Sequence, residues 1–322
     1  DQENGVVRRL GEGTTIFPGA MLLGATGNPD NAYEVGVATG KELKALGINW
    51  NLAPVMDVNN NPENPVIGVR SFGESAEKVS EFGRKVMKGM QEAGVITTLK
   101  HFPGHGDTNV DSHLDLPVIT HNIERLEQIE LKPFIDSIET GADTVMSAHV
   151  YFPAIEDTPG VPATLSRKVI TGLLREKLGF DGVVTTDCME MNAIANTIGT
   201  AKGGVEAIKA GVDLIMVSHL HHLQKETIDA IVTEVESGEI DEAQIEAAVA
   251  RVTRLKEKYC SWEEIGLDEV PQFVGGEEHQ QLAHDIYKQG ITIVKNNGIL
   301  PLMNKRVLVV YSENKYTMQV ED

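Results

Sequence analysis

Short apolar runs of strand-like composition alternate with longer segments of helical period along most of this chain. The strand-like runs are Ile48–Val58, Val95–Lys100, Thr144–His149, Gly182–Thr186 and Val212–Val217. The helix-like segments between them are Tyr33–Leu46, Ala76–Ala93, Ile123–Thr140, Ser166–Leu178 and Gly203–Ala210. Strand-helix-strand units join parallel strands by right-handed crossovers, so this alternation predicts an α/β fold with a parallel sheet.

The helical segments carry two local signals. In 76–93, apolar residues recur three or four positions apart, at Val79, Phe82, Val86 and Met90, which predicts one buried face. Glycines follow several of the segments, as C-caps do, at Gly47, Gly94, Gly141, Gly179 and Gly211.

Polar residues gather at the carboxyl ends of the predicted strands. They are Asp57, Lys100, His101, His149, Asp187, Ser218 and His219. A ring of functional groups from many strands is typical of a (β/α)₈ barrel, whose site lies on that face. An open doubly wound sheet would concentrate its ligand at one switch point. We therefore predict a TIM-type barrel over the open sheet, with the first strand or strands outside this sequence.

Net charge limits the partners. The chain has 28 basic and 48 acidic residues, a formal net charge of -20, which argues against nucleic acid or an anionic membrane surface. No apolar stretch approaches the roughly 18 residues of a membrane span. Cys188 and Cys260 are too few for a disulfide scaffold and do not determine the compartment.

The richest motif runs from Lys100 to Thr108 (KHFPGHGDT) and continues at Asp111-Ser112-His113. Its glycines let backbone approach a ligand, and its lysine, histidines and aspartates supply charge and protons. The stretch resembles the KHFPGHG segment of family 3 glycoside hydrolases. The following Asp-Ser-His resembles the β-N-acetylglucosaminidase branch of that family.

The resemblance extends over nearly the whole chain. Matching segments are residues 1–5 (DQENG), 14–19 (TTIFPG), 51–57 (NLAPVMD), 70–73 (RSFG) and 173–187 (LLREKLGFDGVVTTD). Asn4 stands where glycine is commoner, and Thr185 where an apolar residue is more usual. The resemblance implies a TIM barrel that removes terminal β-linked N-acetylglucosamine with retention of configuration, without a cofactor.

The resemblance also divides the chain. We expect residues 1–260 to form the catalytic barrel, ending in helices Thr227–Val235 and Glu242–Tyr259. Residues 261–276 read as a linker. Residues 277–322 resemble the start of a C-terminal α/β sandwich domain, with a helix at Glu278–Lys288 and strands at Ile291–Lys295 and Arg306–Tyr311. Since the chain starts at Asp1 without a Met, we expect it to be a fragment of a longer protein. The second domain favours a secreted or cell-envelope location.

Asp187 is the predicted nucleophile, because it ends a strand and matches the family's nucleophile signature. A retaining glycosidase needs a carboxylate that attacks the anomeric carbon. Position alone leaves an alternative, since an Asp before a helical run is also a common N-cap.

The resemblance implies that His113 is the general acid/base and that Asp111 orients it. An imidazole can replace the usual second carboxylic acid because its pKa lies near neutrality. The alternative is a solvated surface His and Asp.

Five further residues match sugar-binding positions of the family: Asp1, Arg70, Lys100, His101 and His149. Alternatives are a surface ion pair for Arg70 and a satisfied core histidine for His149. His105 lies in the Pro-Gly-His-Gly turn, where bracing the loop is favoured over touching sugar.

Neither histidine cluster predicts a metal. Residues 101–113 and 219–222 hold several histidines, but the early strand 48–58 has no His-x-His pair. The expected partner is a carbohydrate, an N-acetylglucosamine oligosaccharide or muropeptide. Three alternatives stay open: a β-glucosidase or β-xylosidase of the same family, a phosphorylase, and a sugar-binding module without catalysis. The sequence does not determine the oligomeric state.

Overall fold

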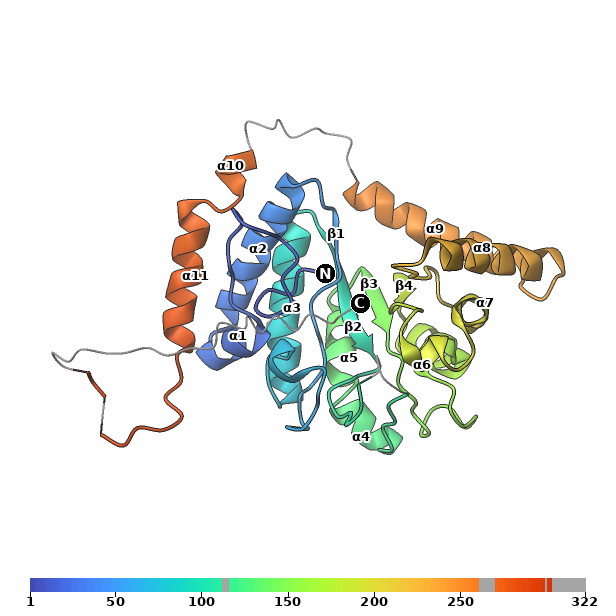
Figure 1. Ribbon diagram of the computed structural model, residues 1–322, viewed down its shortest axis with the longest axis horizontal. Coiled ribbons are helices and arrows are strands. Elements are labelled where there is room, and N and C mark those ends of the chain that lie inside the picture. Colours follow the sequence, from blue (N-terminus) through green and yellow to red (C-terminus); the bar gives the residue numbers. More distant parts are fainter. Residues whose placement is uncertain (112–115, 261–269, 299, 303–322) are drawn as a thin grey trace.

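A parallel sheet forms the centre of the computed structural model, which describes residues 1–111, 116–260, 270–298 and 300–302 (Figure 1). Its strands run in the order β1-β2-β3-β4. They are β1 Trp50–Asn51, β2 Ile96–Phe102, β3 Thr144–Ser147 and β4 Val183–Thr186. All three pairings are parallel, so the predicted α/β fold with a parallel sheet is confirmed.

Two of the predicted strands are shorter than expected. Within Ile48–Val58, pairing is limited to β1 and to a single parallel bridge from Val55 to Lys100. Pro54 interrupts this run, and proline has no N–H for a ladder. Within Val212–Val217, Leu214 makes one parallel bridge, to Thr185. Closure of the sheet into a barrel stays a prediction.

Three helices cover the start of the sheet: α1 Ala20–Thr26, α2 Pro29–Ala45 and α3 Ala76–Glu92. Asn28 caps α2 by accepting from the Asp30 N–H, and Ser75 caps α3 by accepting from Lys78 N–H. The four apolar residues predicted to share one face of α3 are all buried. Gly94 after α3 has φ of 83°, a left-handed conformation that glycine adopts without steric cost.

The predicted helix Ile123–Thr140 is wrong as one element. It is two helices, α4 Ile123–Gln128 and α5 Lys132–Glu139. Pro133 lies in the first turn of α5. Inside a continuous helix its ring would clash with the carbonyl of residue 129, so the chain turns before it.

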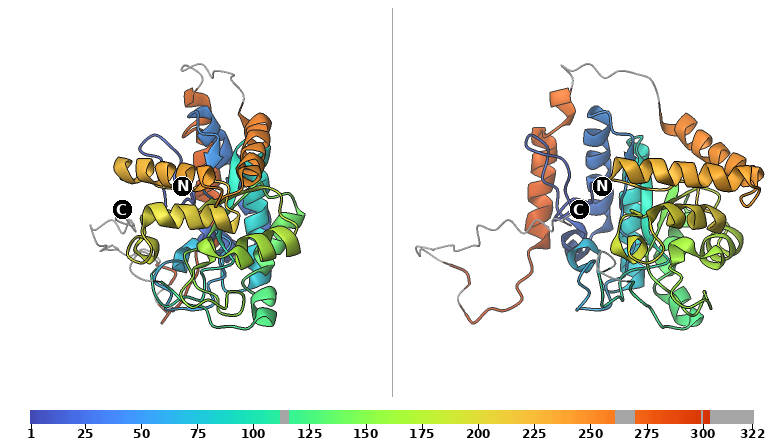
Figure 2. Two further views of the ribbon diagram at one scale, coloured as in Figure 1. Left: turned by 90° about the vertical axis from the view of Figure 1, so that its right-hand side faces the viewer. Right: turned by 45° about the vertical axis from the view of Figure 1, so that its right-hand side comes forward.

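The π-helical segment η3 lies between β3 and β4, and helices α6 to α9 follow β4. A 3₁₀ turn, η1 Gly68–Arg70, precedes α3, and another, η2 Ala163–Leu165, precedes η3. The other bounds are η3 Lys168–Lys177, α6 Asn192–Ala195, α7 Thr200–Ala210, α8 His221–Glu236 and α9 Glu242–Tyr259. Helices α8 and α9 lie on the side of the molecule opposite α11 (Figure 2).

Helix α11, Glu277–Gly290, packs against α1 and α2, and the short α10, Val270–Phe273, lies near α2. Ala283 and Ile286 of α11 are buried in the same apolar cluster as α2 and α3. The linker prediction falls partly on residues 261–269, outside the described residues.

The predicted strand Ile291–Lys295 is wrong. Among the described residues it pairs with no strand, and Ile291, Ile293 and Val294 are largely exposed. The predicted strand Arg306–Tyr311 lies outside the described residues.

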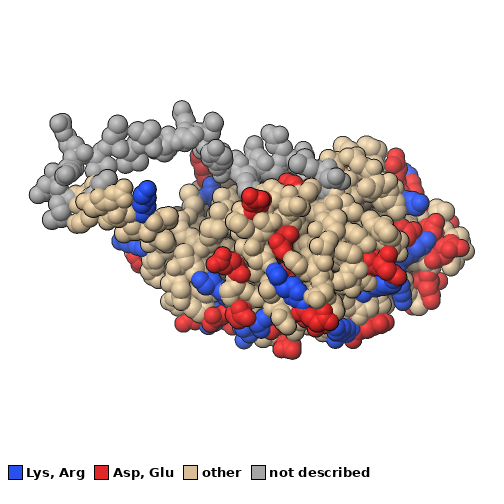
Figure 3. Space-filling view, turned by 90° about the horizontal axis from the view of Figure 1, so that it is seen from below, with Lys and Arg blue, Asp and Glu red and all other residues tan. Residues whose placement is uncertain are grey.

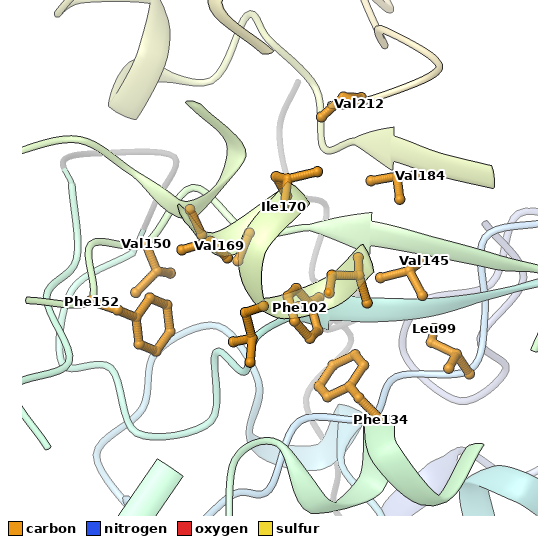
Figure 4. Packing of buried hydrophobic residues seen from close by; sticks show 14 of the residues in the cluster. Leu99, Phe102, Phe134, Val145, Val150, Phe152, Val169, Ile170, Val184 and Val212 are labelled. Atoms are coloured by element: carbon orange, nitrogen blue, oxygen red, sulfur yellow. The ribbon is translucent and has the colours of Figure 1, made fainter. Parts of the chain in front are cut away.

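The main apolar core is built from residues of β2, β3 and β4 and of the helical segments packed against them. Figure 4 shows Leu99 of β2, Val145 of β3 and Val184 of β4 side by side, with Phe134 of α5 packed near Phe102. The rings of Phe102 and Phe134 meet edge to face, 5.3 Å between centroids. This packing holds the strand ends, and so the residues that follow them, in fixed relative positions.

The surface carries charges of both signs. On the face seen in Figure 3, Lys and Arg lie next to Asp and Glu, and no large basic area is visible. Within the described part of the chain, no helix has the length and apolar character needed to span a bilayer.

Candidate active site

The carboxyl ends of the strands bring the predicted residues together around Asp187. Lys100 and His101 are in β2, His149 follows β3 by two residues, and Asp187 directly follows β4. The charges of His101, His149 and Lys100 all act on the Asp187 carboxyl. Of the residues predicted from the sequence, Asp1 and Arg70 join this group through a shared ion-pair network.

Asp187 presents an ionised carboxylate that accepts few hydrogen bonds from the protein. Burial alone would raise its pKa, but His101, His149, the backbone N–H of Cys188 and Lys100 outweigh burial and lower the pKa below the ordinary value. The Cys188 N–H donates to Oδ1 at 2.8 Å. Among the described residues no other side-chain hydrogen bond to Asp187 is present, so Oδ2 is available to a ligand.

Asp57 anchors both histidines of the Lys100–Thr108 motif. Its Oδ2 lies 2.7 Å from His101 Nδ1, and its Oδ1 accepts from the backbone N–H of His101 at 3.2 Å and of His105 at 2.7 Å. The carboxylate is fully buried. Burial would raise its pKa, but His101 and His105 lower it. Asp57 therefore orients the His101 ring, leaving Nε2 without a partner among the described residues.

Glu3 links the two cations predicted to bind sugar. Its carboxylate accepts two bonds from Arg70, at 2.8 and 2.9 Å, and lies 2.6 Å from Lys100 Nζ. Burial alone would raise the pKa of Glu3, but the two cations hold it well below its ordinary value. Lys100 also donates to Asp1 Oδ1 at 2.5 Å. Arg70 is thus a buried ion-pair partner rather than a surface one.

His149 has both ring nitrogens in use. Nδ1 lies 2.8 Å from Thr164 Oγ1, and Nε2 lies 3.0 Å from the carbonyl oxygen of Cys188. The residue is 1% exposed. This is the satisfied-histidine arrangement, and it holds the turn immediately after Asp187. A direct role in binding sugar stays a prediction.

His105 braces the loop that follows β2. Its Nδ1 lies 2.8 Å from Thr108 Oγ1, and Asn64 Nδ2 donates to the His105 carbonyl at 2.9 Å. Burial, followed by the charge of His101, lowers the pKa of His105 from 6.5 to about 4, so the ring is neutral at pH 7.

Gly106 allows a close backbone approach, as its position in the motif predicts, but the group that approaches it is the protein backbone and not a ligand. A Cβ at this position would lie 1.8 Å from the Val58 carbonyl oxygen. The expectation that this glycine admits a ligand is therefore corrected: it lets the loop pack on the segment after β1.

The predicted acid/base His113 lies outside the described residues, so its geometry is not given. Its predicted partner Asp111 is half-buried. The assignment of both residues stays a prediction.

Three residues of the site were not predicted as site residues: Glu3, Asp57 as an anchor, and Asn64. Glu3 lies two residues after Asp1 within the DQENG segment, and its acidic character was the available signal. Asp57 was recognised at a strand end, but its two histidine partners are distant in sequence. Asn64 accepts from the N–H groups of Val66 and Ile67 and has no motif that marks it.

The second histidine cluster lies at the rim. His219, His221 and His222 are exposed. Cys188, Glu190 and His219 have ligand atoms within 4.8 Å of one another. However, the Glu190 carboxylate already accepts from the backbone N–H groups of Ser218, His219 and Leu220, at 2.7 to 2.8 Å. Its present role is to hold the segment before α8.

The fold and site define an α/β protein whose functional groups lie at the carboxyl ends of parallel strands. Residues 1–255 match the model of the glycosyl hydrolase family 3 N-terminal domain. The chain therefore belongs to glycosyl hydrolase family 3.

Known proteins of this family are similar over most of the chain. β-Hexosaminidase A of Pseudoalteromonas piscicida is 36% identical over 96% of this chain and 55% of its own length. The structure of a family 3 β-N-acetylglucosaminidase from Paenibacillus sp. strain FPU-7 is 49% identical, with a TM-score of 0.90 over 92% of this chain and 57% of its own. A β-glucoside phosphorylase, BglX, bound to 2FGlc is 28% identical, with a TM-score of 0.85 over 90% and 54%. The chain thus spans little more than half the length of these relatives.

Proposed function

We propose that this chain carries the catalytic site of a retaining exo-β-N-acetylglucosaminidase. Its substrates would be peptidoglycan fragments or chito-oligosaccharides with a terminal β-linked N-acetylglucosamine. The observation that carries the proposal is Asp187, an ionised carboxylate at the end of β4 with one oxygen free and three basic side chains around it. Similarity to the β-hexosaminidase and the β-N-acetylglucosaminidase supports the choice of sugar.

The reaction takes two steps. In the first, Asp187 attacks the anomeric carbon and the bond to the leaving oxygen breaks, while His113 gives that oxygen a proton. A covalent glycosyl-Asp187 ester results. In the second, His113 takes a proton from water, which attacks the same carbon and frees Asp187. Asp111 orients His113 in both steps.

The remaining donors at the site match a ligand rich in hydroxyl groups. A lysine ammonium has three N–H bonds, and Lys100 uses two of them on Asp1 and Glu3. His101 Nδ1 faces Asp57, which leaves Nε2 for a hydroxyl. Asp1 offers a partly exposed carboxylate. Arg70 holds Glu3 in place, and His149 holds the turn after Asp187. We propose that contact with sugar is secondary for both residues.

The first test uses the full-length protein with nitrophenyl β-glycosides of N-acetylglucosamine and glucose, with and without phosphate. We expect faster release from the N-acetylglucosaminide, with free sugar as product. Mass spectrometry of protein quenched during turnover should find one added sugar on the peptide that contains Asp187. A sugar on another residue, or no activity on either glycoside, would contradict the proposal.

The role of His113 has a separate test. His113→Ala should lower kcat/KM on a chito-oligosaccharide far more, about 10²–10⁴-fold, than on a nitrophenyl glycoside, whose leaving group needs no proton. Asp111→Asn, which keeps the ring but alters its orientation, should show the same bias more weakly. Equal losses on the two substrates would argue against an acid role.

Phosphorolysis is a second candidate because one similar structure is a β-glucoside phosphorylase. A neutral imidazole acid/base does not repel a phosphate acceptor as a carboxylate would. The same assay distinguishes the two reactions, since a sugar 1-phosphate would form only in the phosphorylase. Preference for the glucoside would favour a β-glucosidase.

A further inference from the structure

A second polar cluster lies beyond the loop that follows β2. It consists of Asp107, His121, Arg125, Glu130 and Asn60, and we call it the Asp107 cluster. Asp107 Oδ2 lies 2.5 Å from His121 Nε2. Arg125 Nη2 lies 3.3 Å from Glu130 Oε1 and 4.0 Å from Asp107 Oδ2. None of these five residues takes part in the proposed reaction.

Glu130 is the unusual member of the Asp107 cluster. The residue is 2% exposed, and its Oε2 has no hydrogen-bond partner among the described residues. Its other oxygen accepts from Asn60 Nδ2 at 3.2 Å. Buried carboxylate oxygens are almost always paired, because desolvation of an unpaired one is costly. Asn60 Oδ1, also buried, is unpartnered as well.

The ligand atoms of Asp107, His121 and Glu130 lie within 4.8 Å of one another. We propose that these three side chains bind a divalent transition-metal ion, with zinc as the ion that fits best. Zinc accepts imidazole nitrogen and carboxylate oxygen at about 2.0–2.2 Å. Three such ligands at the corners of a tetrahedron leave the fourth position to water, and Glu130 would gain the partner it lacks.

The change needed to admit the ion is small. Asp107 and His121 are now at hydrogen-bond distance, so the ion would replace the proton between them. Arg125, whose side chain is 33% exposed but whose Nε is buried, would have to give up its bond to Glu130 Oε1 and turn toward solvent. The presence of an imidazole argues against calcium and magnesium, which prefer oxygen ligands.

The Cys188, Glu190 and His219 group is the natural comparison, because its ligand atoms meet the same distance criterion. There the carboxylate oxygens are satisfied by three backbone N–H groups. The Asp107 cluster has an unsatisfied carboxylate oxygen instead. If both groups were exposed to zinc, the Asp107 cluster should therefore fill first.

The test is a calorimetric titration of zinc chloride into full-length, chelator-treated protein. We expect one tight site in the unaltered protein and an affinity at least about 100-fold weaker in His121→Asn. The matched control His219→Asn removes the histidine of the other group and should leave the tight site unchanged. His121 is about one-third exposed, so its variant should fold, and a melting curve without metal checks this.

Cobalt(II) gives an independent readout. Cobalt bound by the Asp107 cluster has no thiolate ligand, so its spectrum should lack thiolate-to-metal charge transfer. Glu130→Gln, which keeps the side-chain shape, should weaken cobalt binding as His121→Asn does. Absence of a tight site in the unaltered protein, or its loss in His219→Asn but not in His121→Asn, would overturn the proposal.

Discussion

Asp57 and Asp187 are aspartates at the ends of two parallel runs in one sheet, yet they are used in opposite ways. Both have a pKa below the ordinary value, and basic side chains lower it in each case. Asp57 accepts three hydrogen bonds, from His101 and His105. The Asp187 carboxylate accepts one hydrogen bond among the described residues, from the backbone N–H of Cys188.

The difference indicates which property suits Asp187 for its proposed role as nucleophile. Burial and a lowered pKa are common to both and do not distinguish them. What differs is the capacity left to accept a new partner. Both oxygens of Asp57 are bonded to the two histidines, whereas Asp187 has one oxygen without a partner among the described residues, as the proposed nucleophile requires.

The largest expected effect comes from Asp187→Asn. An amide cannot form the glycosyl ester, so kcat/KM should fall by about 10⁴-fold or more, the scale seen when a catalytic unit loses its nucleophile. The free energy of unfolding should change by less than about 1 kcal/mol, because only one hydrogen bond is altered. Steady-state assays and urea titration measure the two quantities. Retained turnover would mean that Asp187 is not the nucleophile.

Asp57→Asn should show the opposite pattern, with a large loss of stability and a smaller loss of activity. The amide oxygen can still accept from both backbone N–H groups, but the NH₂ group replaces the oxygen that faces His101 Nδ1. The buried pair with His101 is therefore lost, and unfolding should become easier by about 4 kcal/mol. Activity per folded molecule should fall less than in Asp187→Asn. Chemical denaturation followed by assay of the folded fraction tests both points. A stable but inactive protein would mean that Asp57 is itself part of the chemistry.

The pH dependence of the free energy of unfolding tests whether His105 is buried in its neutral form beside Asp57. Burial lowers the pKa of His105 from 6.5 to about 4, so the unfolded chain binds its proton more readily. Stability is therefore complete above pH 6.5 and is lost as the pH falls toward 4, by at most about 3 kcal/mol. Urea titrations at several pH values should show this slope, and His105→Gln should flatten it. An unchanged slope in the variant would assign it to other groups.

Gly106→Ala should have the smallest effect. The added methyl would meet the Val58 carbonyl, so the loop must shift, at a cost of about 2 kcal/mol. The shift moves His105 and hence its bond to Asp57, while Asp187 is in another segment. Differential scanning calorimetry measures the cost. The control Gly141→Ala has open space for its Cβ but a positive φ, so it measures backbone strain without a collision.

Much of the fold could be predicted from sequence because the signals are local. The apolar spacing of Val79 to Met90 predicted the buried face of α3, and strand β2 was predicted within two residues at each end. Two predictions were wrong because each relied on a single local signal. Pro133 divides the predicted helix after residue 128, and the β-branched run 291–295 pairs with no strand in the part of the chain that the structure describes.

The site was predictable only where a residue carries its own signal. Asp187, Lys100, His101 and Arg70 lie in motifs, and the structure places them in one group, while their roles stay predictions. Their partners depend on contacts between distant segments: Glu3 meets Arg70 across 67 positions, and Asp57 meets His101 across 44. No single-sequence pattern encodes such pairs. His113, on which the acid/base prediction rests, lies outside the described residues.

The attachment of α11 has a consequence for how the chain can be divided. Buried Glu42 accepts from Thr15, faces His279 Nδ1 at 2.9 Å, and accepts from the Gly275 N–H. Gly290, at the end of the helix, lies directly against Leu22. These contacts fix one specific position of α11 against α1 and α2. A chain cut after Tyr259 should therefore be weakened but rescuable, because a free peptide of residues 270–290 carries the complete set of α11 contacts and could restore the protein by fragment complementation.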